Sequence, residues 1–212
     1  MCFTAGASFT ASAVLATAGA ATLREARGKR ELLLASFPII FAVHQAIEGA
    51  LWIVIGSGQL RPLAHGLAAS YLLVAYCVWP IGSPAALYLI EPNPTKRTRM
   101  VPLLLLGAGM SLYLLFYIIL GHVEASVVHR SIYYDIDIPY PDEATVLYAI
   151  AVLLPFFFSS FPPIMILGVM NMLFFGIAYV VYHTTFHSVW CFFAAALSVN
   201  IYLFFRWLRR RR

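Results

Sequence analysis

Charged side chains are scarce in this sequence, and their scarcity excludes most soluble folds. Only 11% of the 212 residues are Asp, Glu, Lys or Arg, against roughly 25% in a typical soluble domain. Hydrophobic residues make up 62% of the chain, and the mean hydropathy is +0.84. A water-soluble fold could not hide that much apolar surface, whereas a bilayer removes the need to hide it. Composition alone therefore predicts an integral membrane protein.

A basic segment is also missing from the N-terminus, so we expect no cleavable signal peptide and expect the first residues to be retained. The net charge of +5 could suggest nucleic-acid binding, but its distribution argues against that. Of the 14 Lys and Arg residues, 12 lie in two turns, 24–30 and 96–99, and in the tail 206–212. The positive-inside rule places these in the cytosol and the uncharged N-terminus outside. We expect a multi-pass protein of the inner (plasma) membrane, in contact with membrane lipids and not with nucleic acid.

Long apolar runs are abundant and predict an all-α bundle of about seven transmembrane helices in a single domain, 1–212. Spans of about 20 residues cross a ~30 Å core. We expect Pro80, Gly82 and Pro84 to kink or break the third helix. The last helix contains no lysine, which excludes a rhodopsin-like retinal protein. The expected helices are 6–23, 32–57, 62–88, 101–120, 144–159, 164–182 and 187–208.

One polar segment, 121–143, interrupts the apolar pattern on the side predicted to be outside. Within it, residues 131–139 alternate in part between apolar and polar side chains, which indicates an extended strand or a short hairpin. Its histidines, tyrosines and carboxylates could cover a site as a lid, or could form an ordinary solvated loop.

Few ionisable residues lie inside the predicted helices, so each is a candidate for function. His44 and Glu48 are four residues apart on one face of the second helix, with Glu48 in its outer half. We predict them as catalytic residues, an acid/base pair. The alternative is a buried pair that holds two helices together.

His183, His187 and Cys191 follow one another at four-residue spacing, which would put all three on one face of an unbroken helix. His-x-x-x-His is a recurrent metal-ligand spacing, because both imidazoles can reach one ion. We predict His183, His187, Cys191 and Glu48 as metal ligands, for zinc or copper. If a turn forms at Thr184 and Thr185, only His187 and Cys191 share a face, and the histidines could simply be interfacial.

Cys2 adds a nucleophile at the same predicted outer depth, and removal of Met1 would leave it N-terminal. An N-terminal cysteine offers an amine and a thiol together, for chelation or nucleophilic attack, so we include Cys2 among the catalytic candidates. The outer compartment is oxidising in many cells, which makes a Cys2–Cys191 disulfide the rival interpretation.

Three stretches carry a resemblance to a known family: the start Met1–Phe9, His44–Gly49 and Ser188–Ala195. Together they resemble an uncharacterised bacterial family of multi-pass membrane proteins whose members typically begin Met-Cys-Phe-Ser-Ala. Thr4 stands here where that family has Ser. The resemblance covers nearly the whole chain and implies no known activity.

The histidine pair His183 and His187 is also similar to the last-helix histidines of seven-helix zinc hydrolases, the alkaline ceramidase and adiponectin-receptor type. That likeness implies zinc and hydrolysis. The hydrolases also use an Asp from an early helix, and the first three predicted helices here contain none.

Two functions of different classes follow. The first is an outward-facing metal site that hydrolyses a lipid-like amide or ester. The second is a non-enzymatic carrier, sensor or subunit of a larger membrane complex, with a small-molecule or lipid ligand, a structural His44–Glu48 pair and the Cys2–Cys191 disulfide.

Overall fold

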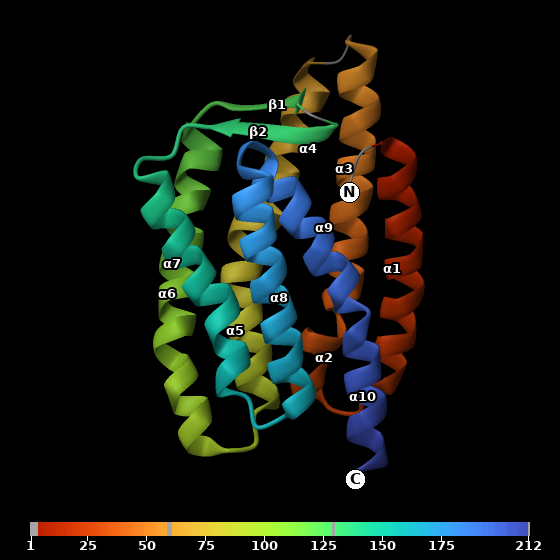
Figure 1. The fold of residues 1–212 in the computed structure, drawn as a ribbon, viewed down its shortest axis with the longest axis vertical. Coiled ribbons are helices and arrows are strands. Elements are labelled where there is room, and N and C mark those ends of the chain that lie inside the picture. Colours follow the sequence, from red (N-terminus) through yellow and green to blue (C-terminus); the bar gives the residue numbers. More distant parts are fainter. Residues whose placement is uncertain (1–3, 59–60, 129, 212) are drawn as a thin grey trace.

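The computed structural model describes residues 4–58, 61–128 and 130–211, and its long helices stand side by side in one bundle (Figure 1). In this described part, seven helical segments are long and apolar enough to cross a membrane. The predicted all-α polytopic bundle is thereby confirmed. The seven segments are Ala5–Glu25, Lys29–Ser57, Arg61–Ile90, Pro94–Leu120, Pro141–Phe158, Pro162–Val181 and His183–Arg210.

Several spans are built from more than one helix. The single helices are α1 (Ala5–Glu25), α6 (Pro94–Leu120) and α8 (Pro162–Val181). The second span joins α2 (Lys29–Ala35) to α3 (Phe37–Ser57), and the third joins α4 (Arg61–Leu73), a π-helix η1 (Val74–Val78) and α5 (Trp79–Ile90). The fifth joins α7 (Pro141–Leu153) to a 3-10 helix η2 (Leu154–Phe158), and the seventh joins a 3-10 turn η3 (His183–Thr185), α9 (Phe186–Ser198) and α10 (Asn200–Arg210).

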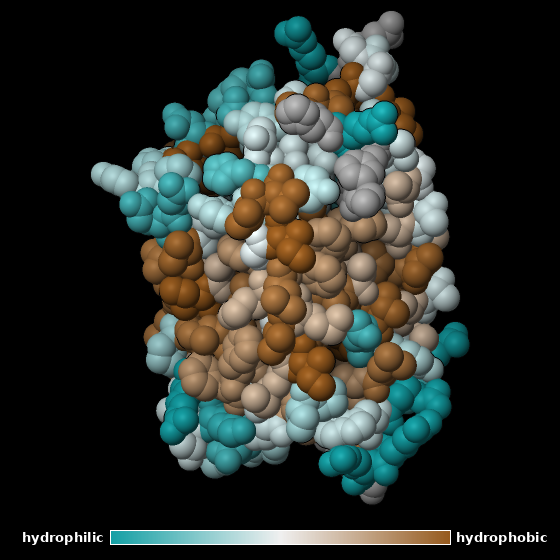
Figure 2. All heavy atoms as spheres, viewed as in Figure 1, coloured by the Kyte–Doolittle hydropathy of each residue, from teal (hydrophilic) through white to brown (hydrophobic). Residues whose placement is uncertain are grey.

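The surface shows why these segments belong in a bilayer. On the face seen in Figure 2, an apolar belt covers the middle of the bundle, and hydrophilic side chains gather at its two ends. Many large side chains of the belt are exposed, including Leu112 and Leu120 at 69% each. Water would penalise such exposure, but lipid does not.

One end of the bundle carries the predicted hairpin. Strands β1 (Val123–Val128) and β2 (Ser131–Ile136) pair antiparallel, with Val123 opposite Ile136. The hairpin is fixed to the helices because the carbonyl of Val123 lies 2.8 Å from His65 Nδ1 on α4. At the far end of the loop, the Tyr113 hydroxyl donates to the carbonyl of Pro139 at 2.7 Å.

The third span changes helix type just before the first of its predicted prolines. A proline ring clashes with the carbonyl four residues earlier, and for Pro80 that residue is Tyr76. The π-helix η1 ends just before Pro80 and widens the turn at this point. The helix continues through Pro84, so these residues do not break it, and the predicted kink stays a prediction. Gly107 of α6 packs here, since a Cβ at this position would overlap the backbone carbonyl of Pro80.

The start of one helix differs clearly from the expected position, and one alternative that the sequence left open is decided. Helix α6 begins at Pro94, well before 101, because Asn93 caps it by accepting from the Lys96 amide at 3.2 Å and Pro94 fits the first turn. The turn at Thr184 and Thr185 forms, as η3. His183 is therefore outside the α-helix that carries His187 and Cys191.

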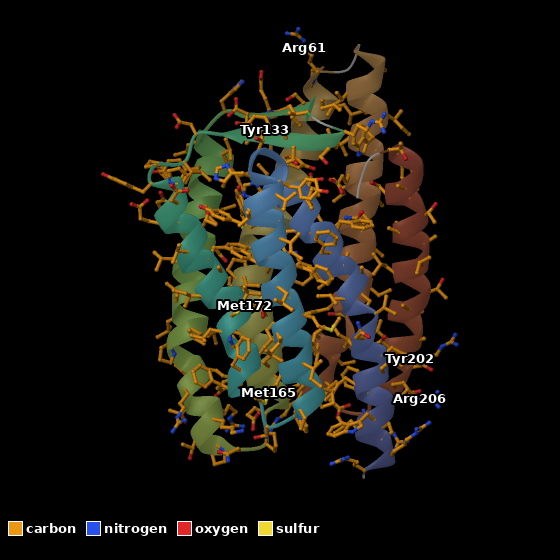
Figure 3. All side chains as sticks on the ribbon, in the orientation of Figure 1. Arg61, Tyr133, Met165, Met172, Tyr202 and Arg206 are labelled. Atoms are coloured by element: carbon orange, nitrogen blue, oxygen red, sulfur yellow. The ribbon has the colours of Figure 1, made fainter. Side chains whose placement is uncertain are left out.

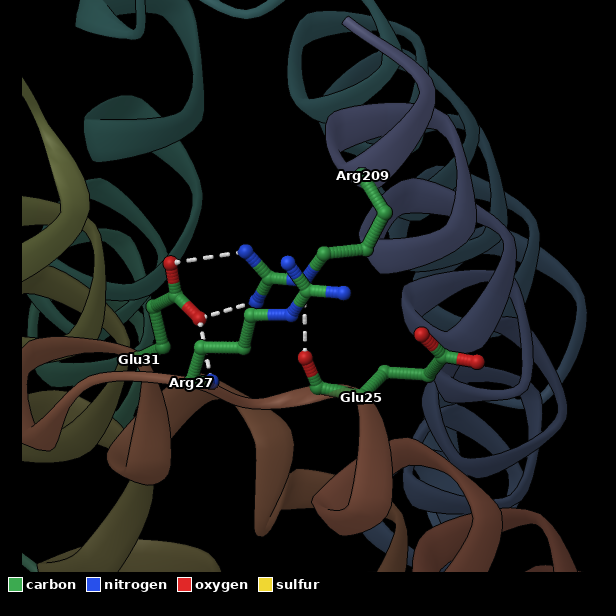
Figure 4. A network of polar contacts seen from close by, with 4 residues as sticks. All are labelled: Glu25, Arg27, Glu31 and Arg209. Atoms are coloured by element: carbon green, nitrogen blue, oxygen red, sulfur yellow. Dashed lines mark hydrogen bonds and ion pairs between the residues drawn. The ribbon is translucent and has the colours of Figure 1, made fainter. Parts of the chain in front are cut away.

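The other end of the bundle carries the arginine-rich turns and the C-terminal helix. Arg209 of α10 forms an ion pair with Glu31 of α2, and its Nε donates to the backbone carbonyl of Glu25 at 2.8 Å (Figure 4). A carboxylate oxygen of Glu31 also accepts from the Arg27 amide at 2.9 Å. The basic tail is thus partly structural, because it fastens α10 to the turn between α1 and α2.

Candidate functional site

A cavity of about 370 Å³ lies beneath the hairpin, inside the end of the bundle that carries it. Its walls come from β2, η1, α6, α7, α8, η3 and α9. Aromatic rings dominate the lining, and a few polar groups stand among them. The residues that could bond a ligand are Tyr76, Tyr133, Tyr134, Asp142, Thr145, Tyr148, Tyr179, His183, Thr184, His187, Trp190 and Cys191.

A tyrosine–histidine pair stands in the lining of this cavity. The Tyr76 hydroxyl and His187 Nε2 lie 2.8 Å apart, and their rings meet edge to face. The π-helix η1 places Tyr76 here, and its widened turn also leaves the carbonyl of Ala75 to accept from the Tyr148 hydroxyl at 2.5 Å. The pair joins the third span to the seventh, and each member can exchange hydrogen bonds with a bound molecule.

The hairpin closes the cavity and is itself stacked onto the bundle. Tyr134 of β2 stacks on Tyr71 of α4 with ring centroids 4.4 Å apart, and Tyr71 stacks on His44 of α3 at 3.9 Å. All three are buried. This column of rings runs from the hairpin into the bundle and holds β2 above the cavity.

The mouth of the cavity is polar. The Tyr133 hydroxyl lies 3.4 Å from Asp135 Oδ1, and burial, followed by the neighbouring Asp135 carboxylate, raises the pKa of Tyr133 above its usual value. The Tyr179 hydroxyl donates to Asp142 Oδ1 at 3.3 Å, and Tyr179 also meets the ring of His183. Figure 3 shows Tyr133 on the hairpin, at the end of the bundle opposite Tyr202 and Arg206.

Glu48 forms a second polar centre, between α3 and α9. Ser188 donates to Glu48 Oε1 at 2.5 Å, and Gln45 donates to Glu48 Oε2 at 3.3 Å. Glu48, Gln45 and Ser188 are fully buried. Ser188 follows His187 directly, so adjacent residues of α9 serve the Glu48 centre and the cavity.

The predicted pair His44 and Glu48 lies on the buried face of α3, yet each has a partner of its own. His44 Nε2 lies 3.1 Å from the carbonyl of Tyr71, while Glu48 bonds Ser188. Among the described residues no hydrogen bond joins His44 to Glu48. His44 Nδ1 is buried and has no hydrogen-bond partner in the part of the chain that the structure describes.

The predicted metal ligands divide between these two places. His183, His187 and Cys191 line the cavity, whereas Glu48 lies in the neighbouring centre. Within the described ranges, no three His, Cys, Asp or Glu side chains come close enough together to hold a metal ion. Within the described residues, neither Cys191 nor Cys77 is part of a disulfide. Cys2 falls outside the described residues, so its catalytic role and the Cys2–Cys191 disulfide stay predictions.

The sequence did not single out Tyr76, Tyr148, Tyr179 or Trp190, because aromatic residues in apolar helices are common packing groups. Gln45 and Ser188 could have been identified from the sequence, because each is a polar residue next to a predicted site residue in an apolar segment. Of the outer loop, Tyr133 and Tyr134 reach the cavity, while His122 and Glu124 pair with one another at 3.0 Å on the surface.

Comparison with known proteins gives a family and no activity. A family model matches residues 1–212, and its description is "Family of unknown function (DUF6629)". No curated protein and no solved structure matches the chain.

Proposed function

The chain belongs to DUF6629, a family of unknown function, and we propose that it is a membrane sensor or carrier that binds a small organic molecule in the cavity under the hairpin. The cavity itself is the observation that supports this most directly. Its volume of about 370 Å³ falls in the range of about 300–1,000 Å³ typical of ligand pockets.

The chemistry of the lining favours binding. Ligand sites are mostly apolar and aromatic, with few polar groups that fix orientation. Here Tyr76 and His187 supply those groups at the centre, and Tyr148 and Trp190 supply ring surface beside them. A ligand hydroxyl, carbonyl or amine would compete for the bond between Tyr76 and His187, and the surrounding rings would exclude water from it.

The hairpin supplies the cover. Tyr133, Tyr134 and Ile136 of β2 line the cavity, so movement of β2 would change access to it. Because the carboxylate of Asp142 and the ring of His183 stand at the rim with Tyr179, we assign entry to this side.

A cavity-filling variant tests the proposal. Ala144 lines the cavity, so Ala144→Trp should occupy its space, whereas Val146→Trp on the same helix places the same ring on a surface that is 57% exposed. Native mass spectrometry of protein extracted with its surrounding lipid should find a small molecule retained by the wild type and by Val146→Trp, and lost from Ala144→Trp. The proposal is wrong if the wild type retains none, or if Ala144→Trp retains it equally.

A metal-dependent hydrolase is the second candidate, and the shared lining of His183, His187 and Cys191 favours it. Zinc or copper would take its ligands from these three residues, and the target would be a lipid-like amide or ester. Metal analysis of purified protein tests this candidate. Stoichiometric metal that is lost in His183→Ala and His187→Ala supports it, and background metal in all three proteins refutes it.

The orientation belongs to the same proposal. We place the hairpin end outside the cell and the arginine-rich end in the cytosol, with the protein in the plasma membrane, because 12 of the 14 Lys and Arg gather at the latter end. A membrane-impermeant reagent should then reach a tag after the last arginine only in opened cells. Labelling of that tag on intact cells would reverse the assignment.

A further inference from the structure

Five aromatic rings in the lining of the large cavity contact one another in a closed circuit. Tyr76 meets Tyr148 with ring centroids 6.3 Å apart, and Tyr148 meets Trp190 at 5.6 Å. Trp190 stacks on Phe186 at 5.6 Å, Phe186 meets His187 at 5.2 Å, and His187 returns to Tyr76 at 5.3 Å. All five line the cavity, and we call them the aromatic cluster.

Burial distinguishes this cluster from the aromatic belt of a membrane protein. A belt places Tyr and Trp at the interface between lipid and water, on the outside of the bundle. Here Tyr76, Phe186 and Trp190 are each 5% exposed, and Tyr148 is 7% exposed. The rings therefore border internal space, where their π-electrons are available to a bound molecule.

The formal charge in the lining is negative. In the part of the chain that the structure describes, Asp142 is the only lining side chain with a full charge at neutral pH, because the lining contains no Lys, Arg or Glu. Tyr179 donates to Asp142 Oδ1, and no Lys or Arg among the described residues forms an ion pair with this carboxylate. Tyr179 also meets Phe186 with ring centroids 5.8 Å apart, so the carboxylate stands next to the aromatic cluster.

The surrounding end of the bundle adds to this negative charge. Figure 3 shows Arg61 beyond the hairpin, and Arg130 stands at the hairpin turn, five residues before Asp135, which is roughly 16 Å at about 3.3 Å per residue. An excess of carboxylates at a cavity mouth attracts cations and repels anions. The described charged residues of this end are Glu124, Asp135, Asp137, Asp142 and Glu143 against Arg61 and Arg130.

From the buried aromatic cluster and the carboxylate beside it, we infer that the ligand is a small organic cation, a quaternary ammonium or a protonated amine. The inference rests on the proposed function and names its ligand class. Trp, Tyr and Phe rings attract such a cation through their π-electrons, and the exclusion of water strengthens that attraction. Asp142 supplies the opposite charge at the mouth of the cavity.

A matched pair of probes isolates the contribution of the charge. Choline and 3,3-dimethylbutan-1-ol have the same shape, but the alcohol has a carbon atom where choline has its ammonium nitrogen. Their affinities can be measured by titration calorimetry on the protein in nanodiscs, with empty nanodiscs as the blank. Choline should bind to the wild type about tenfold more tightly than the alcohol.

Two carboxylates of α7 provide the control for Asp142. Asp142 and Glu143 both lie in the first turn, where the helix dipole stabilises a carboxylate with or without a ligand. Of the two, Asp142 lines the cavity and Glu143 does not. Asp142→Asn should therefore weaken choline binding about fivefold, whereas Glu143→Gln should weaken it less than about twofold.

Two phenylalanines of α9 provide the control for the rings. Phe186 belongs to the aromatic cluster, whereas Phe193 stacks on Phe174 and does not line the cavity. Phe186→Leu should lower the ratio of choline affinity to alcohol affinity about threefold, and Phe193→Leu should leave the ratio unchanged. The ratio is informative because a change of cavity shape alone affects both probes alike.

The possible results separate the two proposals. The cation inference is overturned if choline binds no more tightly than the alcohol, if Asp142→Asn behaves like Glu143→Gln, or if Phe186→Leu and Phe193→Leu give the same ratio. If Ala144→Trp still abolishes retention of a small molecule in any of these cases, the proposed function stands with a ligand of another class. If the wild type retains no molecule and binds neither probe, both proposals fail.

Discussion

The ion pair between Arg209 and Glu31 allows a quantitative prediction. Both side chains are only 8% exposed, and Arg209 Nε also donates to the Glu25 carbonyl (Figure 4). Arg209→Met keeps much of the apolar stem but removes the positive charge. Glu31 then remains buried with the Arg27 amide, at 2.9 Å, as a neutral donor. Helix α10 loses its main polar attachment to the turn between α1 and α2.

The expected loss follows from the burial of the pair. Removing one partner of a buried pair costs about 3–5 kcal/mol, because the other charge stays buried and uncompensated. Glu31 keeps the hydrogen bond from the Arg27 amide and lies near the end of the bundle, so we expect about 3 kcal/mol, at the lower limit. Arg210 is exposed, so Arg210→Met should change the free energy of unfolding by about 0.5 kcal/mol or less.

The assay is unfolding of the purified protein by SDS in mixed micelles, followed by tryptophan fluorescence and circular dichroism. Adding Glu31→Gln to Arg209→Met should recover part of the loss, because it removes the buried carboxylate charge that Arg209 no longer balances. If Arg209→Met is no less stable than Arg210→Met, the pair contributes nothing and the reasoning fails. If Glu31→Gln adds a further loss of the same size, the two side chains act independently.

Three further predictions use the same unfolding assay, the first two with a matched variant and the third together with the retention measurement by native mass spectrometry. Gly107→Ala should lose about 3 kcal/mol because its Cβ would overlap a carbonyl of α5, whereas Gly109→Ala faces open space and should lose nothing; equal stability of the two would contradict the packing. Ser188→Ala removes a donor to buried Glu48 and should lose about 1–3 kcal/mol, against no loss for the exposed Ser70→Ala. Tyr76→Phe should weaken retention of the bound molecule without changing stability by more than about 1 kcal/mol, and full retention would remove Tyr76 from the site.

The seven spans could be predicted because a bilayer imposes a simple rule on the sequence. Every spanning segment must be long, apolar and internally hydrogen-bonded, so hydropathy alone locates it. The hairpin was also predictable, because residues 131–136 alternate and stand alone between apolar runs. Helix ends were less predictable: the start of α6 depends on the Asn93 cap and Pro94, which lie in a charged segment that hydropathy ignores.

The site was only partly predictable, because the sequence of one span does not show which residues of the other spans it contacts. His187 and Cys191 were predicted from spacing and do line the cavity. Tyr76 faces the cavity because η1 widens the helix before Pro80. No local sequence pattern distinguishes such a tyrosine from one that only packs against neighbouring helices. Similarly, the Arg209–Glu31 pair joins residues far apart in sequence, and the tail alone suggested only a cytosolic anchor.

Burial and neighbouring open space point to different polar residues of this bundle as functional candidates. Glu48 is the most expensive residue to place in a membrane and is for that reason the first functional candidate. Both its oxygens accept hydrogen bonds from the protein, one from Ser188 and one from Gln45. The bond from Ser188 holds α3 against α9. His187 is beside Ser188 on α9, but its Nε2 and the Tyr76 hydroxyl border a cavity of about 370 Å³. The two adjacent residues therefore have different roles. Ser188 holds α9 against α3 through its bond to Glu48. That attachment also positions His187, whose bond with Tyr76 is exposed to a molecule bound in the cavity.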